Sequence, residues 1–544
     1  MIKNIVNQFS KNFKSGLSVA IVSIPLSIPL AVASWATPLQ GILTAIYAGL
    51  MASLFGWSKY NIVGPAGALS GILFLFALKR WAAFLPLLAL VSWAIILLIS
   101  VLRMTKYITL IPSTALHGFM MGVGITIAAT QFNNALWLTG LPKHKEFLMN
   151  VRETIIHYPD IKIFSVVVFA IAFGLIILSK RYLKQLPAVI PVSTVGILFW
   201  YLNAHYFGLP LLKLGDQFPE LSFLFFEAPQ WLSSLKDYAF IKDLLMSGLV
   251  VALVALLETI ISAKIADRAK KSHFNQEKEV FWLSLANLLS GLMGGLPASG
   301  VFVRTAVNFK SGATSSYSQL ISSICILLIS LFLFSSFSYL PLPVVAAILI
   351  NVALWMIDIP LYKKIFSYNR GAFFILMIVG ILCLIEDPMV GILVGTAISL
   401  LIYLKNSSDG HLYATVFRDG KFFGKMNLRN YCPHQKASDI VICKFSGEIN
   451  FITISAEIDQ LCKLQDKATV ILSFSHITHI DLDGLETLEE ICEYFDLHGI
   501  EYYFSGVDGE LLSMFKKTHY YRTLHDQWRI WHSSSFILQK LGVN

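Results

Sequence analysis

Residues 294–308 read G-G-L-P-A-S-G-V-F-V-R-T-A-V-N, and this stretch decides the fold. It places three glycines, a proline and Arg304 in the middle of a run of apolar segments. Lipid normally enforces an unbroken helix, and irregular backbone persists at membrane depth only where protein buries it or where it lines a water-filled cavity. We therefore interpret the stretch as the wall of a binding cavity.

The composition is that of a polytopic membrane protein. Of the 544 residues, 56% are hydrophobic and 14% are charged, and the mean hydropathy is +0.67, more apolar than a soluble domain. The net charge of +9 comes from Lys and Arg spread over loops, with no recognition helix or long basic run, so we expect no nucleic-acid partner. The six cysteines contain no C-x-x-C pair, and we expect neither a disulfide nor a zinc site.

Apolar runs of about 20 residues, bounded by charges or turns, predict the transmembrane segments. There are fourteen of them, at 16–36, 39–56, 64–79, 82–102, 114–137, 161–179, 187–207, 241–264, 279–296, 299–309, 317–336, 341–357, 371–386 and 388–404. The segments 64–79 and 299–309 are short and open on Gly-Pro or Pro-x-x-Gly, which is typical of half-helices.

The loop charges predict the orientation in the membrane. Most Lys and Arg residues fall on the loops of one side, with exceptions at Lys79, Arg80, Lys143 and Lys145. The positive-inside rule then places both termini in the cytoplasm and the chain in the inner (cytoplasmic) membrane. Residues 1–15 are predicted to be a retained cytoplasmic lead-in.

An internal repeat relates the two halves of the membrane part. Residues 15–31 resemble residues 247–263 at an offset of 247 − 15 = 232, and the same shift places Pro65-Ala66 on Pro297-Ala298. Seven predicted spans separate the copies, and an odd number turns the second copy upside down. The repeats cover about 16–207 and 241–404. Their two broken segments should therefore meet from opposite sides near the midplane.

The composition changes abruptly after residue 404. Residues 405–437 are predicted to be a polar linker, and residues 438–544 a small soluble domain. Runs at 440–445, 469–474 and 501–505 indicate strands, those at 452–464 and 485–497 indicate amphipathic helices, and 524–541 indicates a final helix. Alternating strands and helices predict an α/β layer.

Arg304 is the candidate for holding an anion. A cation within a span costs about 2.5–3.5 kcal/mol on insertion scales, so it faces a cavity, a counter-ion or the interface. Arg304 either pairs with an acid to hold two helices together or raises the potential beside helix N-termini, whose N–H groups attract an anion. The two roles are compatible.

Glu258 is the candidate for coupling to a cation. It stands alone among apolar residues, with Ser262 on the same helix face at i+4. Three roles remain open: a counter-charge for Arg304, a proton-carrying acid, or an oxygen ligand for Na⁺ together with Ser262 and the broken backbone. Thr259 lies beside them, and its hydroxyl is expected to bond back to its own helix. Apart from H⁺ or Na⁺ as a coupling ion, no cofactor or metal is expected.

These motifs resemble the SulP anion transporters, the sulfate permease and solute carrier twenty-six group. The resemblance covers nearly the whole chain. It rests on I-P-L-S-I-P-L-A at 24–31, V-G-P-A-G-A at 63–68, H-G-F-M-M-G-V-G-I-T-I at 117–127, and above all G-x-P-x-x-G-x-x-x-R-T-x-x-N at 295–308. It implies a uracil-permease-like fold of two inverted seven-helix repeats, elevator-type movement and homodimers. The domain at 438–544 resembles a cytoplasmic STAS domain, and a cytoplasmic protein partner is a possible ligand for it.

The resemblance also implies where the substrate lies. In the family it sits between the N-termini of the third and tenth helices, and an acidic residue on the eighth helix, here Glu258, is associated with cation coupling in some members. The substrate residues implied here are Ala66, Gly67, Ala68, Ala298, Ser299, Gly300, Val301 and Arg304.

Three departures from the family pattern concern the substrate and regulation. The chain has Pro25-Leu26 where many sulfate-type members have Pro-Gln, and leucine resembles the sodium-coupled bicarbonate branch. That branch has a threonine where this chain has Ala66, and Asp-Thr where this chain has Glu258-Thr259. In the STAS segment, Leu482 and Asp483 stand where regulatory relatives carry a serine, so phosphorylation of that loop is not expected.

The sequence thus predicts a secondary active transporter of a small inorganic oxyanion, with sulfate first, by cation symport or anion exchange. Sodium-coupled bicarbonate transport is the alternative, and an anion channel is a further one. A channel is distinguished by flux that cannot accumulate the substrate against a gradient. A nucleobase permease fits less well, since a neutral ring needs paired acceptors and stacking. No nucleophile–base pair, phosphate loop or metal triad indicates an enzyme.

Overall fold

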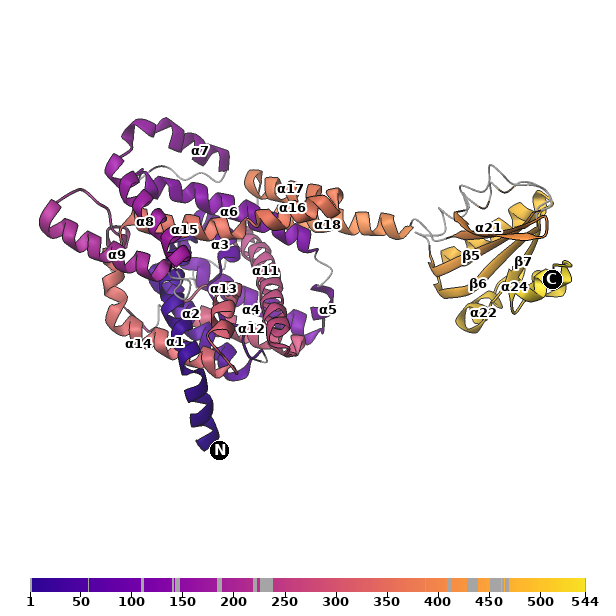
Figure 1. The fold of residues 1–544 in the computed structure, drawn as a ribbon, viewed down its shortest axis with the longest axis horizontal. Helices are drawn as coiled ribbons and strands as arrows, with labels where there is room; N and C mark the ends of the chain where they lie inside the picture. Colours follow the sequence, from indigo (N-terminus) through magenta and orange to yellow (C-terminus); the bar gives the residue numbers. More distant parts are fainter. Residues whose placement is uncertain are drawn as a thin grey trace. The chain divides into compact units, whose positions relative to one another are not determined.

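The computed structural model divides the chain into two compact units, Met1–Ser399 and Leu400–Asn544 (Figure 1). It describes residues 2–56, 58–108, 112–138, 141, 147–182, 188–218, 223–225, 238–386, 388–408, 412–427, 439–450, 461, 464 and 469–543.

The first unit is a bundle of helices. They are α1 (Ile2–Ala33), α2 (Pro38–Phe55), α3 (Gly67–Arg80), α4 (Leu85–Val101), α5 (Thr105–Ile108), α6 (Ser113–Ala135), α7 (Phe147–Ile156), α8 (Ile163–Tyr182), α9 (Val189–Leu202), α10 (Leu214–Gln217), α11 (Tyr238–Lys270), α12 (Gln276–Leu292), α13 (Phe302–Lys310), α14 (Tyr317–Leu333), α15 (Leu342–Met356), α16 (Ile359–Tyr368), α17 (Arg370–Ile385) and α18 (Pro388–Ser408). Each of the fourteen predicted spans contains one of these helices, and α5, α7, α10 and α16 are short additions between them.

Helix lengths distinguish full spans from half-helices. Within the described residues, seven helical segments are long and apolar enough to cross a membrane by length and composition alone. Helices α3 and α13 have 14 and 9 residues. At about 1.5 Å per residue they are too short for a hydrocarbon core of about 30 Å, as half-helices should be.

The first helix extends through the predicted lead-in. Residues 2–15 belong to α1, which runs from Ile2 to Ala33 without a break, and their cytoplasmic location stays a prediction. Asn12 explains part of this continuity. It is fully buried, and its amide oxygen accepts from the backbone N–H of Thr314 at 2.7 Å and of Ser315 at 3.2 Å. The beginning of α1 is therefore anchored to the loop that follows α13.

The two broken segments meet as the repeat predicts. Strand β1 (Val63–Gly64) pairs antiparallel with β2 (Ser299–Gly300), with Val63 opposite Gly300 and Gly64 opposite Ser299. Helix α3 begins three residues after β1 and α13 two residues after β2. We call this short ladder with its two helix N-termini the crossing.

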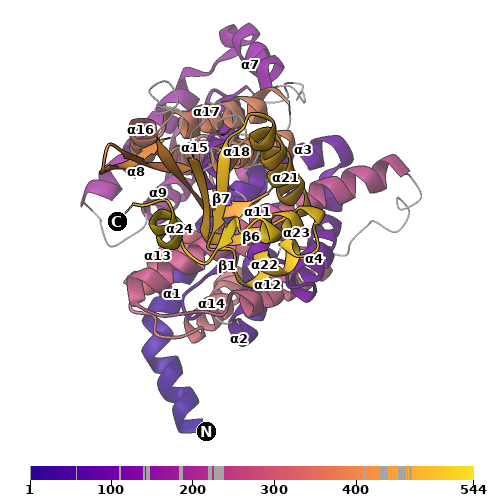
Figure 2. The same cartoon turned by 90° about the vertical axis from the view of Figure 1, so that its right-hand side faces the viewer.

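The second unit is a six-stranded sheet in the order β4-β3-β5-β6-β7-β8. Strands β5 (Ile440–Ile449), β6 (Thr469–Ile480), β7 (Glu501–Ser505) and β8 (Ile530–Trp531) are parallel. Helices α21 (Leu482–Leu497), α22 (Gly509–Phe515) and α23 (His519–Asp526) cover one face, and α24 (Ser534–Lys540) covers the other (Figure 2). The α/β layer predicted from the sequence is confirmed.

Two boundaries in this part differ from the prediction. Residues 405–437 were predicted to be a linker, yet they contain the hairpin of β3 (Tyr413–Arg418) and β4 (Lys421–Asn427), and β3 pairs with β5. The final helix predicted at 524–541 is interrupted by β8, because pairing with β7 completes the sheet edge. Most of the helix predicted at 452–464 lies outside the described residues.

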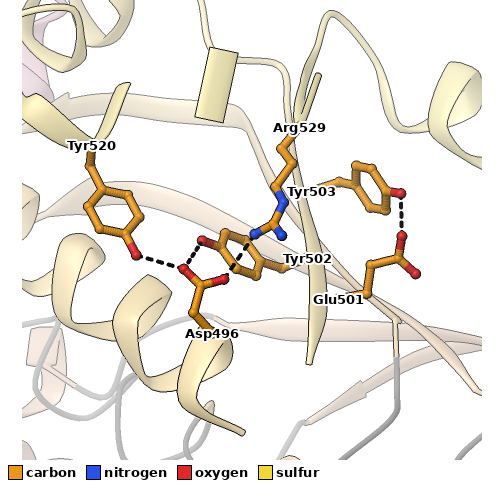
Figure 3. A network of polar contacts seen from close by, with 6 residues as sticks. All are labelled: Asp496, Glu501, Tyr502, Tyr503, Tyr520 and Arg529. Carbon is orange, nitrogen blue, oxygen red and sulfur yellow. Dashed lines mark hydrogen bonds and ion pairs between the residues drawn. The ribbon is translucent and has the colours of Figure 1, made fainter. Parts of the chain in front are cut away.

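A polar cluster fastens α23 and the approach to β8 onto α21 (Figure 3). The Asp496 carboxylate accepts hydrogen bonds from the Tyr502 hydroxyl at 3.1 Å, the Tyr520 hydroxyl at 2.9 Å and the Arg529 guanidinium at 3.1 Å. The Arg529 guanidinium also lies 4.5 Å from the centroid of the Tyr502 ring. Burial raises the pKa of the Tyr502 hydroxyl far above its usual value, so the hydroxyl stays a donor to Asp496.

We predict that Tyr503, next along β7, makes the stability of this unit fall in alkali. Burial, and then the hydrogen bond to Glu501, raise the pKa of Tyr503 to about 12, whereas an unfolded tyrosine titrates near 10. The folded chain therefore holds the proton more tightly. The stabilisation is complete below about pH 10 and is lost as pH rises through about 12.

Thermal unfolding of the full chain and of Tyr503→Phe, measured over this pH range, checks the prediction. The wild-type unit should lose more stability than the variant. Equal losses in both proteins would contradict the assignment to Tyr503.

Candidate functional site

The crossing brings the N-termini of two half-helices into one place. The backbone before α3 ends at the N-cap Ala66 and that before α13 at Val301, and neither N-cap carries a side-chain hydrogen bond to the helix. The first turn of a helix has N–H groups without a partner inside the helix, and these attract anions. Ala66, Ala68, Ala298 and Ser299 are buried at this point, while Gly67 and Val301 keep some exposure.

Arg304 lies in the first turn of α13 and is 1% exposed. Its Nη2 donates to the hydroxyl of Ser27 on α1 at 3.1 Å, and its buried Nε has no hydrogen-bond partner among the described residues. No described acid lies within ion-pair distance of its guanidinium. The counter-ion that a buried cation needs is therefore not supplied by a direct protein contact in this part of the chain.

Gly64 makes room for this guanidinium. A Cβ atom built on Gly64 would lie 2.6 Å from Arg304 Nη1, which is closer than any side chain tolerates. Glycine at position 64 therefore lets a strand of the first repeat lie directly against a cation of the second. The charge of the crossing comes from one repeat, and the space for it comes from the other.

Glu258 reaches the crossing from α11. Its Oε2 accepts a hydrogen bond from the Ser299 hydroxyl at 2.5 Å. Glu258 stays partly exposed, whereas Thr259 and Ser262 on the same helix are buried. The charges of Glu258 and Arg304 are near enough to interact electrostatically, but Glu258 makes its close contact with Ser299.

Thr259 and Ser262 join α11 to the crossing by hydroxyl bonds. Thr259 donates to the carbonyl of Ala255 at 2.6 Å, which confirms the predicted bond to its own helix, and it accepts from the Gly300 N–H at 2.8 Å. Ser262 donates to the hydroxyl of Thr305 at 3.0 Å. Glu258 and Ser262, grouped as possible Na⁺ ligands, thus bond to different partners, and the described residues hold no cluster of three or more His, Cys, Asp or Glu side chains suited to a metal.

Side chains from neighbouring helices form hydrogen bonds with the non-helical backbone before α13. Asn287 on α12 accepts from the N–H of Ala298 at 2.9 Å and donates to its carbonyl at 3.0 Å. Ser290 donates to the carbonyl of Leu296 at 2.7 Å, and Thr44 on α2 accepts from the Leu296 N–H at 2.6 Å. Buried backbone groups left unpaired would each cost roughly 1–3 kcal/mol, so these residues make the broken helix possible.

The sequence reasoning missed a second buried acid. Glu279, 5% exposed at the start of α12, accepts from the N–H of Ser58 at 2.9 Å and from the side chain of Asn61 at 3.0 Å. Asn61 in turn accepts from Thr305 at 3.3 Å. Glu279 is the first residue of a predicted span, where a charge usually marks the membrane boundary and does not indicate a buried site. Asn61 stands two residues before β1, so the predicted meeting of the two broken segments could have indicated that it lies at the crossing.

Comparisons with known proteins extend this picture. A family model described as the sulfate permease family matches residues 9–379, and a STAS domain model matches residues 431–533. Sulfate transporter 4.1, chloroplastic, of Arabidopsis thaliana is 26% identical in an alignment of 529 positions that covers 91% of this chain and 74% of that protein. The bicarbonate transporter BicA of Picosynechococcus is 25% identical over 72% of this chain and 70% of that protein.

A solved structure shares the fold. The murine solute carrier 26 family member A9 anion transporter, in an inward-facing state, matches 98% of this chain and 91% of its own, with a TM-score of 0.81 and 14% identity. At this identity the likeness concerns the fold alone. It confirms the predicted architecture, a helical transport domain followed by a STAS domain.

Proposed function

The chain belongs to the sulfate permease family, and from this premise we propose that it carries a small inorganic oxyanion, sulfate first, across the cytoplasmic membrane. The family consists of anion transporters rather than enzymes. The single observation that carries the proposal is the buried Arg304, with an unpartnered Nε, beside two helix N-termini without side-chain caps. An oxyanion placed there supplies the counter-charge for Arg304. It also accepts hydrogen bonds from the Arg304 Nε–H and from the backbone N–H groups at the two helix N-termini.

Glu258 and Ser299 offer a way to couple the anion to a cation. While Glu258 is ionised, the Ser299 hydroxyl donates to it and is not available to the anion. A proton or Na⁺ at Glu258 neutralises the carboxylate and releases the hydroxyl, which then donates to an oxygen of the substrate. Binding of the cation thereby favours binding of the anion, and by linkage the reverse holds equally.

Hydrogen bonds from neighbouring helices would let the crossing move together with those helices as a rigid body. Helices α2, α11 and α12 hold the backbone before α13 through side-chain bonds, so the anion site keeps its geometry if these elements move together. This supports the elevator-type motion that we propose. A homodimer with both termini in the cytoplasm belongs to the same proposal. Sodium-coupled bicarbonate transport is the second candidate, because Pro25-Leu26 resembles that branch. It ranks second because Ala66 presents a methyl group where that branch carries a threonine hydroxyl.

Uptake of labelled sulfate and bicarbonate into proteoliposomes, with imposed Na⁺ or proton gradients, tests the proposal. Accumulation of one of these anions against its gradient supports a coupled transporter. Flux that only dissipates a gradient indicates a channel, and the absence of flux for every small anion would sink the proposal.

Glu258→Gln is predicted to uncouple transport without abolishing it. The amide keeps the shape and stays neutral, so Ser299 is no longer held by a carboxylate. Anion exchange should persist, while accumulation driven by the Na⁺ or proton gradient should be lost. Glu277→Gln, at the first turn of α12, is the control, because Glu277 is outside the crossing. Unaltered gradient dependence in Glu258→Gln would show that the role assigned to Glu258 is wrong.

A further inference from the structure

A cavity of about 510 Å³ lies against the C-terminal halves of α1, α3 and α6. Helices α7 and α10 contribute to its wall, and the rings of Trp35 and Phe74 contact each other on its surface with centroids 5.9 Å apart. A water molecule takes about 30 Å³ in the liquid. The cavity therefore has room for a small oxyanion together with several waters.

The polar wall of this chamber consists of carboxamides and hydroxyls. No Asp, Glu, Lys or Arg is among the residues that the structure places around it. The carboxamides are those of Gln131, Asn133, Asn134, Asn150 and Gln217.

Two of these carboxamides have their oxygen atoms already engaged. Gln131 accepts from Asn134 within α6 at 2.9 Å, and Asn133 accepts from Thr154 at 2.7 Å. The amide NH₂ groups of Gln131 and Asn133 carry no hydrogen bond to other described residues. Gln131 is 4% exposed, so an NH₂ group there is satisfied only by what enters the chamber.

The chamber lies along the helices that lead away from Arg304. On α1, five residues separate Ser27, the partner of Arg304, from Val32 on the chamber wall, which is about 7.5 Å of helix. On α3, seven residues separate Gly67 at the crossing from Phe74, which is about 10 Å. The two sites are thus neighbours along the same elements.

We propose that the chamber is a second anion station, where a partly hydrated oxyanion rests on the amide donors of Gln131 and Asn133 before it reaches Arg304. The inference rests on the proposed function. An amide donor carries no charge of its own and offers no ion pair to the oxyanion, so the station holds the substrate less tightly than the guanidinium of Arg304 does. With both termini in the cytoplasm, the chamber opens toward the outer side of the membrane.

The test measures transport kinetics from each side separately, in cells or in proteoliposomes of defined orientation, with labelled sulfate and bicarbonate. Gln131→Leu and Asn133→Leu each remove one donor at similar volume. Loss of one hydrogen bond to the charged anion, about 1.5–3 kcal/mol, raises KM for entry from the chamber side roughly 10- to 150-fold. KM from the opposite side and the maximal rate should stay unchanged. Gln527→Leu, an exposed carboxamide of the second unit, is the control and should change neither KM.

The outcomes separate this inference from the proposed function. If the wild-type chain transports no anion, the proposed function fails. If the wild type transports an anion and neither leucine variant alters KM from the chamber side, the second station is overturned, as it is if both sides change equally. Asn133 is only partly buried, so Asn133→Leu decides the matter even if the buried Gln131→Leu misfolds.

Discussion

Arg304→Met is expected to weaken anion binding by roughly 10- to 150-fold, since a hydrogen bond to a charged group contributes about 1.5–3 kcal/mol. Methionine keeps most of the volume of the arginine stem and removes the cation. The fold should survive, because replacing a buried charge by an apolar side chain is often neutral or stabilising. Uptake kinetics, together with the amount of folded protein recovered, measure both effects.

Lys310→Met is the matched control for this prediction. Lys310 is the other cation of α13, in its last turn, and its side chain is exposed. Its removal changes the net charge by the same amount without touching the crossing, so transport should be nearly unchanged. Equal losses in both variants would mean that overall charge, rather than a local contact of Arg304, governs uptake.

Gly64→Ala is expected to reproduce much of the Arg304→Met defect although it alters no charge. The added methyl would lie 2.6 Å from Arg304 Nη1, while its next neighbours, Ala45 Cα and Arg304 Cζ, would lie 3.8 Å away. The guanidinium is the end of a flexible side chain and can move aside, so the crossing keeps its backbone while Arg304 leaves its position. Anion affinity should fall, and expression and melting temperature should stay close to wild type.

Gly174→Ala provides the control, because a methyl on this glycine of α8 meets nothing within 4 Å. The double variant of Gly64→Ala and Arg304→Met adds a sharper comparison. If the methyl acts only by displacing Arg304, the double variant should be no worse than Arg304→Met alone. Additive losses would instead point to a second effect on the backbone of β1.

The sequence was sufficient for the parts of the fold that leave a periodic or repeated mark. The 232-residue offset located both broken segments, and the structure pairs them as β1 and β2. Arg304 and Glu258 could be found because a charge in an apolar run is conspicuous. The bond partners of these two residues could not be found, since Ser27 and Ser299 look like ordinary small residues until three-dimensional packing brings them close.

Other features were hidden for physical reasons. Asn287 and Thr44 replace backbone partners of the broken helix, and no local pattern distinguishes such residues from polar residues at a helix surface. The hairpin β3–β4 has short strands broken by charges and glycines, so its composition matched a linker and its pairing with β5 was invisible locally. The contact between Asn12 and the loop after α13 joins residues far apart in the sequence, so the amphipathic pattern of residues 1–15 did not reveal it.

The way the crossing is built also determines where substitutions can accumulate. Gly300 admits no side chain, since a Cβ there would lie 2.7 Å from the Asn61 amide and 2.8 Å from the Thr259 backbone, and a Cβ on Gly64 would displace the Arg304 guanidinium. Substitutions at these two glycines therefore disturb either the backbone of the crossing or its cation, whereas position 66 presents only a buried methyl group at the N-cap of α3. Changes of substrate are therefore expected to involve position 66 rather than the glycines.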